Sequence, residues 1–216
     1  MNFEAARIQM LGQQVRAWEV LDDRVLGVMR ETPRELFVPE KDRELAFADS
    51  EIPLGHGQCM LAPKVEGRLL QALQIEPADD VLEIGAGSGY MTACLARLAH
   101  RVTSVDIFAD FVSGAADRLR RLDVHNVDLT AADAFSLSYA NSFDAIAVTG
   151  SVPSSSDHFL NMLKPHGRLF IVIGRAPVME ASLFTMHPGG HWTRRDLFET
   201  LLTPLLNAEQ PEPFVL

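Results

Sequence analysis

The sequence predicts an α/β fold: a doubly wound, mostly parallel sheet with helices on both faces. Two observations indicate it. From residue 81 to 173, short apolar runs typical of buried strands alternate with stretches whose apolar residues recur at helical spacing. Within this region, residues 81–90 (VLEIGAGSGY) have the order strand, glycine turn and helix start. We also expect a helical extension at the N-terminus and an antiparallel hairpin at the C-terminus.

The N-terminal region predicts three helices and a loop. A helix over about residues 5–20 follows from an apolar stripe at helical spacing: Ile8, Leu11, Val15 and Trp18. Asp22 can cap a second helix, which should end near Pro33. Prolines and glycines interrupt any periodicity in residues 47–63, so this stretch is expected to be loop. A third helix follows, with an apolar face made of Val65, Leu69 and Leu73.

The C-terminal two thirds of the chain predict the sheet itself. Apolar runs place five strands at residues 81–84, 102–106, 127–131, 143–149 and 168–173. Helices are expected between them, at about residues 90–98, 108–122 and 159–163. Two further runs, 181–186 and 192–198, flank Pro188-Gly189-Gly190 and predict the hairpin. We expect residues 1–78 to form a helical and loop region packed on a core of residues 79–216, as one compact domain overall.

Composition restricts the classes of function. The chain has 216 residues, of which 47% are apolar and 22% charged, as in an ordinary soluble globular protein. A formal net charge of −10 argues against non-specific binding to nucleic acid or to an anionic membrane. Cys59 and Cys94 show no paired spacing, no apolar run approaches about 18 residues, and the histidines show no metal-ligand pattern. We therefore expect a cytoplasmic protein without a metal site.

The glycine turn carries the first information about a ligand. A dinucleotide loop has the pattern G-x-G-x-x-G or ends in alanine, but here the third place falls on Tyr90. The spacing E-x-G-x-G-x-G suits a ligand with an adenosine and no phosphates, whose amino-acid end lies against the turn. It resembles motif I of the S-adenosylmethionine-dependent methyltransferases with the Rossmann-like fold. This resemblance implies S-adenosylmethionine as cofactor, S-adenosylhomocysteine as product and no metal.

Three acidic residues lie at or near the carboxyl ends of predicted strands, where doubly wound folds bind their ligands. Asp106 is placed to accept hydrogen bonds from both ribose hydroxyls, and Asp133 from the adenine amino group; Glu83 lies just before the glycine turn. The alternative for each acid is a helix cap or a solvent-facing side chain. The residues expected to bind the cofactor are Glu83, Gly85, Ala86, Gly87, Ser88, Gly89, Asp106, Ile107, Ala132 and Asp133.

A more specific resemblance rests on five segments in a fixed order. They are residues 34–39 (RELFVP), 52–58 (IPLGHGQ), 81–90, 132–133 (AD) and 163–169 (LKPHGRL). This ordered set is similar to the protein-L-isoaspartate O-methyltransferase family over roughly residues 8–175, and the two segments before the glycine turn are the most family-specific. The resemblance implies methylation of the α-carboxylate of L-isoaspartyl residues in damaged proteins or peptides, as a step in protein repair.

One departure from the family pattern concerns the methyl acceptor. The acceptor loop expected from the resemblance consists of Gly57, Gln58, Cys59, Met60 and Leu61. The family's serine, which is assigned an active-site role, matches Leu61, so no catalytic residue is assigned. Leucine offers no hydrogen bond to a carboxylate. Three alternatives therefore stay open: a methyltransferase with a different, less polar acceptor; a cofactor-binding module without catalysis; and, more distantly, a nicotinamide oxidoreductase.

Overall fold

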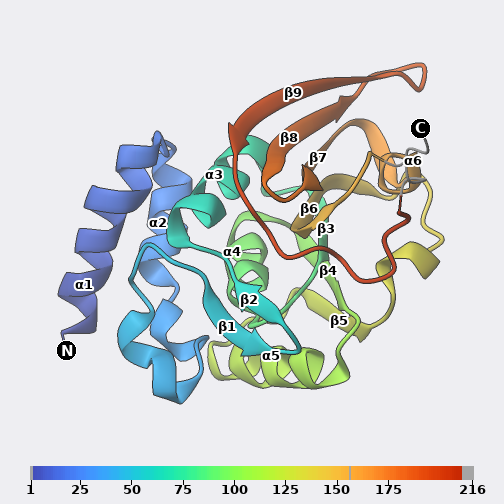
Figure 1. The fold of residues 1–216 in the computed structure, drawn as a ribbon. Helices are drawn as coiled ribbons and strands as arrows, with labels where there is room; N and C mark the ends of the chain where they lie inside the picture. Colours follow the sequence, from blue (N-terminus) through green and yellow to red (C-terminus); the bar gives the residue numbers. More distant parts are fainter. Residues whose placement is uncertain (1, 156, 211–216) are drawn as a thin grey trace.

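The computed structural model describes residues 2–155 and 157–210, which form a seven-stranded sheet flanked by helices and a two-stranded hairpin (Figure 1). The strand order in the large sheet is β5-β4-β3-β6-β7-β8-β9. The strands are β1 (Ile52–Gly55), β2 (Gln58–Met60), β3 (Asp80–Ile84), β4 (Arg101–Asp106), β5 (Val127–Ala131), β6 (Phe143–Val152), β7 (Leu163–Arg175), β8 (Val178–Met186) and β9 (Trp192–Glu199).

The parallel part of the sheet is doubly wound, as the sequence predicts. The central strand β3 pairs in parallel with β4 on one side and with β6 on the other. From β3 the chain builds outward through β4 to β5, and then crosses back to begin again at β6. The carboxyl ends of β3 and β6 therefore form the point where the winding direction changes, which is where such folds bind ligands.

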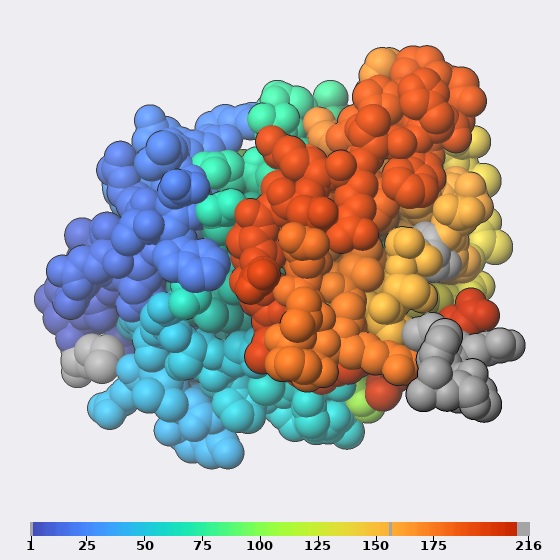
Figure 2. Space-filling view, turned by 45° about the horizontal axis from the view of Figure 1, so that its top comes forward, coloured from blue at the N-terminus to red at the C-terminus, as the bar shows by residue number. Residues whose placement is uncertain are grey.

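The C-terminal end of the sheet is antiparallel. Strand β8 pairs antiparallel with β7, and β9 pairs antiparallel with β8. The predicted hairpin is thus confirmed, with both strands slightly longer than expected. In Figure 2 these two strands form a broad orange to red surface beside the blue N-terminal helices.

The later helices pack on the faces of the sheet, and α1 and α2 lie to one side of it (Figure 1). They are α1 (Phe3–Met10), α2 (Asp23–Glu31), α3 (Pro63–Leu73), α4 (Tyr90–Leu98), α5 (Ala109–Arg121) and α6 (Asp157–Leu160). Helix α1 continues as a π-helical turn and a 3-10 turn to Trp18. The predicted cap of α2 is confirmed, because the Asp22 side chain accepts from the Arg24 N–H at 2.8 Å. No helix in the described part of the chain is long and apolar enough to span a membrane.

Three local predictions were wrong. Ile8 is 55% exposed, so it does not belong to the buried face of its helix. The stretch 47–63 contains the hairpin of β1 and β2, whose strands of four and three residues are too short for a periodic signal. The helix expected at 159–163 is a single turn, because Leu163 already pairs with Phe143 as the start of β7.

The apolar core lies on both faces of the sheet. Neighbouring residues of β3 point to opposite faces: Val81 belongs to one apolar cluster, and Leu82 and Ile84 belong to the other. The first cluster also contains the buried residues of α1 to α4, from Met10 onward. The N-terminal segment therefore shares its core with the sheet, and it can fix the position of the β1–β2 hairpin relative to the carboxyl ends of the strands.

Candidate active site

A pocket lies at the carboxyl ends of β3, β4 and β6, at the change in winding direction. The space between its walls is about 750 Å³, a figure that includes open solvent. Its walls combine strand ends, the β1–β2 hairpin and the segment after β9. The lining residues are Glu51, Leu54, Gln58, Cys59, Leu61, Ile84, Gly85, Gly87, Val105, Asp106, Ile107, Phe108, Phe111, Ala132, Asp133, Ala134, Thr149, Gly150, Thr203, Leu205 and Leu206.

The glycine turn forms one wall, and each of its glycines has a positive φ. A side chain on Gly85 would collide with the hydroxyl of Thr149, and one on Gly89 would lie 2.9 Å from the Cβ of Ala115. Gly87 is different, because the only atom within 4 Å of an added Cβ belongs to Leu54 of the hairpin. Gly85 and Gly89 thus permit close packing inside the protein, whereas Gly87 lies in the pocket wall, where an added Cβ would crowd Leu54 of the hairpin.

Asp106 lies where β4 ends, with its carboxylate in the pocket wall. One oxygen accepts from the Gly87 N–H at 2.8 Å and the other from the Phe108 N–H at 3.0 Å. Burial raises the pKa of this carboxyl, while the two N–H groups lower it. Each oxygen of a carboxylate can accept a second hydrogen bond. Asp106 can therefore fix the glycine turn and still bind a pair of ligand hydroxyls.

Asp133 lies just beyond β5, and it also lines the pocket. One oxygen accepts from the Phe135 N–H at 2.9 Å, and the other accepts from the Asn207 side chain at 2.9 Å. The carboxylate thus caps a short 3-10 turn and ties the C-terminal segment to the sheet. Ala132 and Ile107, two further predicted residues, line the same pocket.

Glu83 does not line the pocket. It is fully buried on the face of β3 that α4 covers, where its Oε2 accepts from the hydroxyls of Thr92 and Ser104, both at 2.5 Å. Its Oε1 is buried without a partner. Burial is the main cause that raises the pKa of Glu83 to about 8. Where the sequence predicts a contact with a ligand, the structure has two hydrogen bonds, which link Glu83 of β3 to α4 and to β4.

The acceptor loop forms the wall opposite the glycine turn. Gln58, Cys59 and Leu61 line the main pocket, and Met60 lines a small adjoining cavity together with Ala86 and Ser88. Two other predicted residues, Gly57 and Gly89, lie outside both cavities: Gly57 is part of the hairpin turn, and Gly89 packs against α5. Leu61 is 6% exposed, and its side chain presents an apolar surface to the pocket.

A buried arginine anchors the base of this loop. Arg34 is fully buried and donates to the carbonyl oxygens of Leu61 at 2.6 Å and of Ala46 at 2.7 Å. Its guanidinium also pairs with the buried carboxylate of Glu66 on α3 and lies 4.8 Å from the ring centre of Tyr90 on α4. A fully buried guanidinium is costly unless a carboxylate and hydrogen-bond acceptors surround it, so Arg34 needs these partners. The backbone of the loop is therefore fixed at the carbonyl group of Leu61.

Comparison with known proteins settles the family. A model of the family described as protein-L-isoaspartate(D-aspartate) O-methyltransferase (PCMT) matches residues 6–210. The chain belongs to this family. A protein-L-isoaspartate O-methyltransferase from Rhodopseudomonas palustris is 36% identical over 94% of this chain and 96% of its own length. A second relative, protein-L-isoaspartate O-methyltransferase 2 from Pelobacter propionicus, is 34% identical over 96% of this chain and 93% of its own.

A solved structure shows the same fold. A candidate protein-L-isoaspartate O-methyltransferase from Plasmodium falciparum, in complex with S-adenosyl-L-homocysteine, superposes with a TM-score of 0.78. The match covers 95% of this chain and 98% of that one, at 20% sequence identity. The methyltransferase fold predicted from the sequence is therefore confirmed across nearly the whole chain, including its N-terminal helices.

Several lining residues of this isoaspartyl methyltransferase family member were not predicted from the sequence. Thr149 is the last residue of the strand predicted at 143–149 and Gly150 follows it, so the rule that ligands bind at strand ends is sufficient to find them. Phe108 and Phe111 fall within the helix predicted at about residues 108–122, and the sequence pattern gives no sign that they line a pocket. The others are brought to the pocket by the tertiary fold: Glu51, Leu54, Thr203, Leu205 and Leu206. Among the described residues, no group of three or more histidine, cysteine or acidic side chains is arranged to hold a metal ion.

Proposed function

We propose that this protein transfers a methyl group from S-adenosylmethionine to the carboxylate of an isoaspartyl residue in a damaged protein or peptide. The observation that carries the proposal is the pocket at the change in winding direction, where Gly87 and the carboxylate of Asp106 lie together in one wall. Family membership supports the reaction class, and the Plasmodium falciparum structure supports the cofactor, since it holds S-adenosyl-L-homocysteine.

The chemistry of the lining residues fits this cofactor better than a dinucleotide. In place of the third glycine or alanine that a dinucleotide fold needs near the pyrophosphate, the turn has Tyr90, and the described lining residues of the pocket include no lysine, arginine or histidine. The pocket does have acids for hydroxyl and amino groups: Asp106 for the ribose and Asp133 for the adenine. Gly85, Ala86, Gly87 and Ser88 would receive the amino-acid end along the turn, with Ile107 and Ala132 as apolar walls. A nicotinamide cofactor is correspondingly disfavoured.

The bound cofactor supplies an electrophilic methyl group on sulfur, and the protein has to orient the acceptor. A carboxylate is already ionised at pH 7, so no general base is required. The contribution of this chain is positional: the glycine turn and Asp106 fix one partner, and the acceptor loop fixes the other. Leu54, Leu61 and Leu205 surround the space between them with apolar surface, which excludes water from the reacting atoms.

The test separates cofactor binding from methyl transfer. Calorimetric titration should show binding of S-adenosylmethionine and none of NAD. Asp106→Ala should weaken S-adenosylmethionine binding by about 1.5–3 kcal/mol, the scale of hydrogen bonds to a charged group. Methyl transfer is then measured with an isoaspartyl peptide and with the same peptide containing ordinary aspartate. Transfer to neither peptide, by a protein that binds the cofactor, would reject the isoaspartyl acceptor.

A second candidate acceptor is favoured by two side chains at the loop. Leu61 matches the family's serine and has no hydroxyl, and Glu51 is a carboxyl group in the pocket wall, where burial raises its pKa. Both side chains oppose an anionic acceptor: Leu61 offers it no hydrogen-bond donor, and Glu51 repels it wherever its own carboxyl is ionised. We propose a neutral, less polar acceptor as this alternative. Radiolabelled S-adenosylmethionine with a cell extract distinguishes it, since label would enter a product that does not hydrolyse as a methyl ester does.

A further inference from the structure

The tip of the β1–β2 hairpin makes a contact that the proposed reaction does not require. His56 forms the turn between Gly55 and Gly57, and all three residues have a positive φ. The hairpin consists of two short strands, and a two-stranded hairpin of this size is marginally stable by itself. Its position over the pocket therefore depends on the packing of its side chains against the core and on the contacts of its two ends.

The tip is attached to α5 and to the residue that precedes it. His56 Nε2 lies 2.9 Å from Asp110 Oδ2, and this contact lowers the pKa of the Asp110 carboxyl. The imidazole ring stacks on Phe108, with ring centres 4.2 Å apart and planes inclined by 10°. It also meets Phe111 edge-on at 5.3 Å. The tip is thus held by one hydrogen-bonded pair and by two aromatic contacts.

The aromatic partners of His56 are themselves walls of the pocket. Phe108 and Phe111 line it, and the N–H of Phe108 is bonded to Asp106. On the other side of the opening, Leu54 and Gln58 of the hairpin line the same pocket. His56 therefore joins the two sides of the opening, at the place where the hairpin crosses it.

We propose that His56 is a positioning residue that latches the hairpin closed over the cofactor pocket, and that this latch opens to admit and release the cofactor. The proposal rests on the cofactor site of the proposed function, and it does not depend on the identity of the methyl acceptor.

The contacts at the base of the hairpin are stronger than those at its tip, and this difference decides which end opens. At the base, buried Arg34 holds the Leu61 carbonyl. At the tip, the side chains of His56 and Asp110 are 44% and 64% exposed, and exposed pairs of this kind contribute little stability. The hairpin is therefore expected to open at its tip and to pivot about its base.

Two variants of His56 separate its hydrogen bond to Asp110 from its ring stacking on Phe108. His56→Phe keeps a ring to stack on Phe108 and loses the bond to Asp110, whereas His56→Gln keeps an N–H donor and loses the ring. The probe is S-adenosylhomocysteine, and the readouts are its association and dissociation rate constants. Each variant should raise the association rate constant about two- to fivefold, because one contact that favours the closed state is lost: the pair with Asp110 in His56→Phe, and the stacked ring in His56→Gln.

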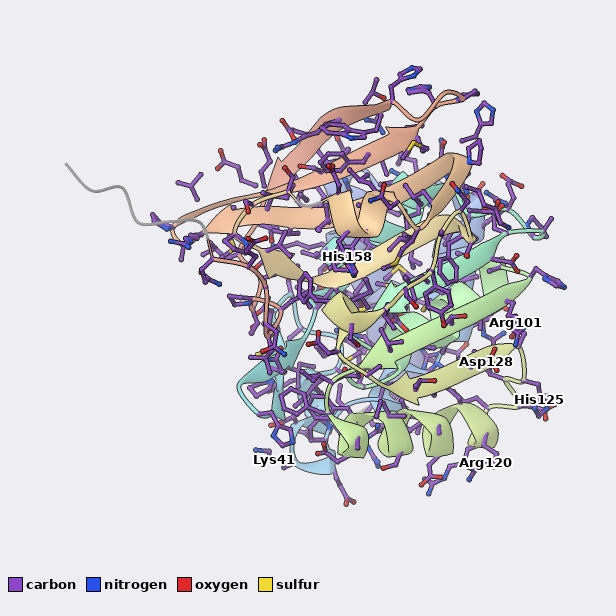
Figure 3. All side chains as sticks on the ribbon, turned by 90° about the vertical axis from the view of Figure 1, so that its right-hand side faces the viewer. Lys41, Arg101, Arg120, His125, Asp128 and His158 are labelled. Atoms are coloured by element: carbon purple, nitrogen blue, oxygen red, sulfur yellow. The ribbon has the colours of Figure 1, made fainter. Side chains whose placement is uncertain are left out.

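A matched control is present at the opposite end of the sheet. His125 makes the same type of contact with Asp123, at 2.7 Å, and Figure 3 shows it beside Asp128 and Arg101, far from the hairpin. His125→Gln should leave both rate constants unchanged. If the His56 variants raise only the dissociation rate constant, His56 merely supports the Phe108 wall, and the latch is rejected.

A second measurement needs no ligand, so it separates failure of the latch from failure of the proposed function. Amide hydrogen exchange over residues 52–60 should be faster in His56→Phe and His56→Gln than in the unaltered protein, while exchange in α4 stays the same. Equal exchange over 52–60 in all three proteins would overturn the latch even where the cofactor binds normally. An unaltered protein that shows no binding of S-adenosylhomocysteine would reject the proposed function, and the exchange result would still decide the latch.

Discussion

At the scale of single residues, Glu83 shows how burial changes what an acid does. Its carboxyl lies between Thr92 and Ser104, out of contact with the pocket, and its raised pKa of about 8 means that it is mostly protonated at pH 7. An acid that binds its proton more tightly in the folded protein stabilises the fold at low pH. This contribution is lost as the pH rises from the unfolded value toward 8, because the unfolded chain then holds fewer protons than the folded one.

Replacing Glu83 by glutamine should remove this pH dependence. The free energy of unfolding of the unaltered protein is expected to fall between pH 5.5 and pH 8, by up to about 1.4 kcal/mol per pH unit from this group. Glu83→Gln keeps an acceptor for the two hydroxyls and has no proton to lose. Denaturant titrations of both proteins at several pH values give the difference. Asp128→Asn, at an exposed acid, is the control; parallel curves for Glu83→Gln and the unaltered protein would contradict the raised pKa.

Leu61 is the residue on which acceptor chemistry depends most directly. Its side chain is buried, and the sequence resemblance matches it to a serine of the family, so we predict slow transfer to an isoaspartyl peptide. Leu61→Ser should raise turnover on the order of tenfold, if one hydrogen bond of about 1.4 kcal/mol is regained in the transition state. The backbone there is already fixed by Arg34, so the new hydroxyl has a defined place.

The control for Leu61→Ser is Leu61→Ala, which creates a similar space without a hydroxyl. A gain in both variants would assign the effect to space in the pocket and not to hydrogen bonding. Affinity for S-adenosylmethionine, measured by calorimetry, should stay nearly unchanged in the serine variant, because the glycine turn, Asp106 and Asp133 are untouched. Fast transfer to an isoaspartyl peptide by the unaltered protein would show that backbone groups of the loop suffice.

At the scale of elements, the glycine turn is the unit that joins β3 to α4 and shapes the pocket. Gly87→Val should abolish binding of S-adenosylmethionine more completely than Asp106→Ala. The branched side chain would stand in the pocket 3.2 Å from Leu54, at a φ of 49° that such residues rarely adopt. Gly27→Val is the control, since nothing lies within 4 Å of a Cβ added there. A folded Gly87→Val protein with near-normal affinity would disprove this role.

The hairpin of β1 and β2 is the element that the sequence concealed. Its glycines and Pro53 are typical of loop, and its strands are too short for alternation to be visible. Pairing of Ile52 with Met60 across the turn forms it, and packing of its side chains against the core keeps it in place. The same shortness permits a latch at the tip, because little backbone bonding has to be broken when the hairpin moves.

At the scale of the whole molecule, the pocket is assembled from segments far apart in the chain. The N-terminal segment supplies Arg34, the hairpin supplies the acceptor loop, and the sheet supplies the glycine turn. The segment after β9 returns to the same edge, where Pro204 forms an isolated bridge with Ser151 of β6. In Figure 1 this red segment passes across the strand ends close to β2. The site therefore combines segments from the N-terminal and the C-terminal parts of the described chain with the sheet.

The sequence alone determined the elements whose signal is local. The run from β3 through the glycines to α4 follows from neighbouring residues, as does the Asp22 cap, because strand burial, positive φ and capping each act within a few positions. The parallel order of the strands placed Asp106 and Asp133 correctly at the pocket, since the carboxyl ends of parallel strands meet at one edge.

Only the tertiary structure decided the features that depend on distant partners. Glu83 points away from the pocket because the hydroxyls of Thr92 and Ser104 bind it inside the core. The residues around Glu83 in the sequence do not predict these two partners. Leu205 and Leu206 reached the pocket because the chain returns to β6, more than fifty positions earlier. A contact between residues so far apart in the sequence costs chain entropy, and the packing of the whole core has to offset that cost. Patterns of neighbouring residues therefore cannot predict it.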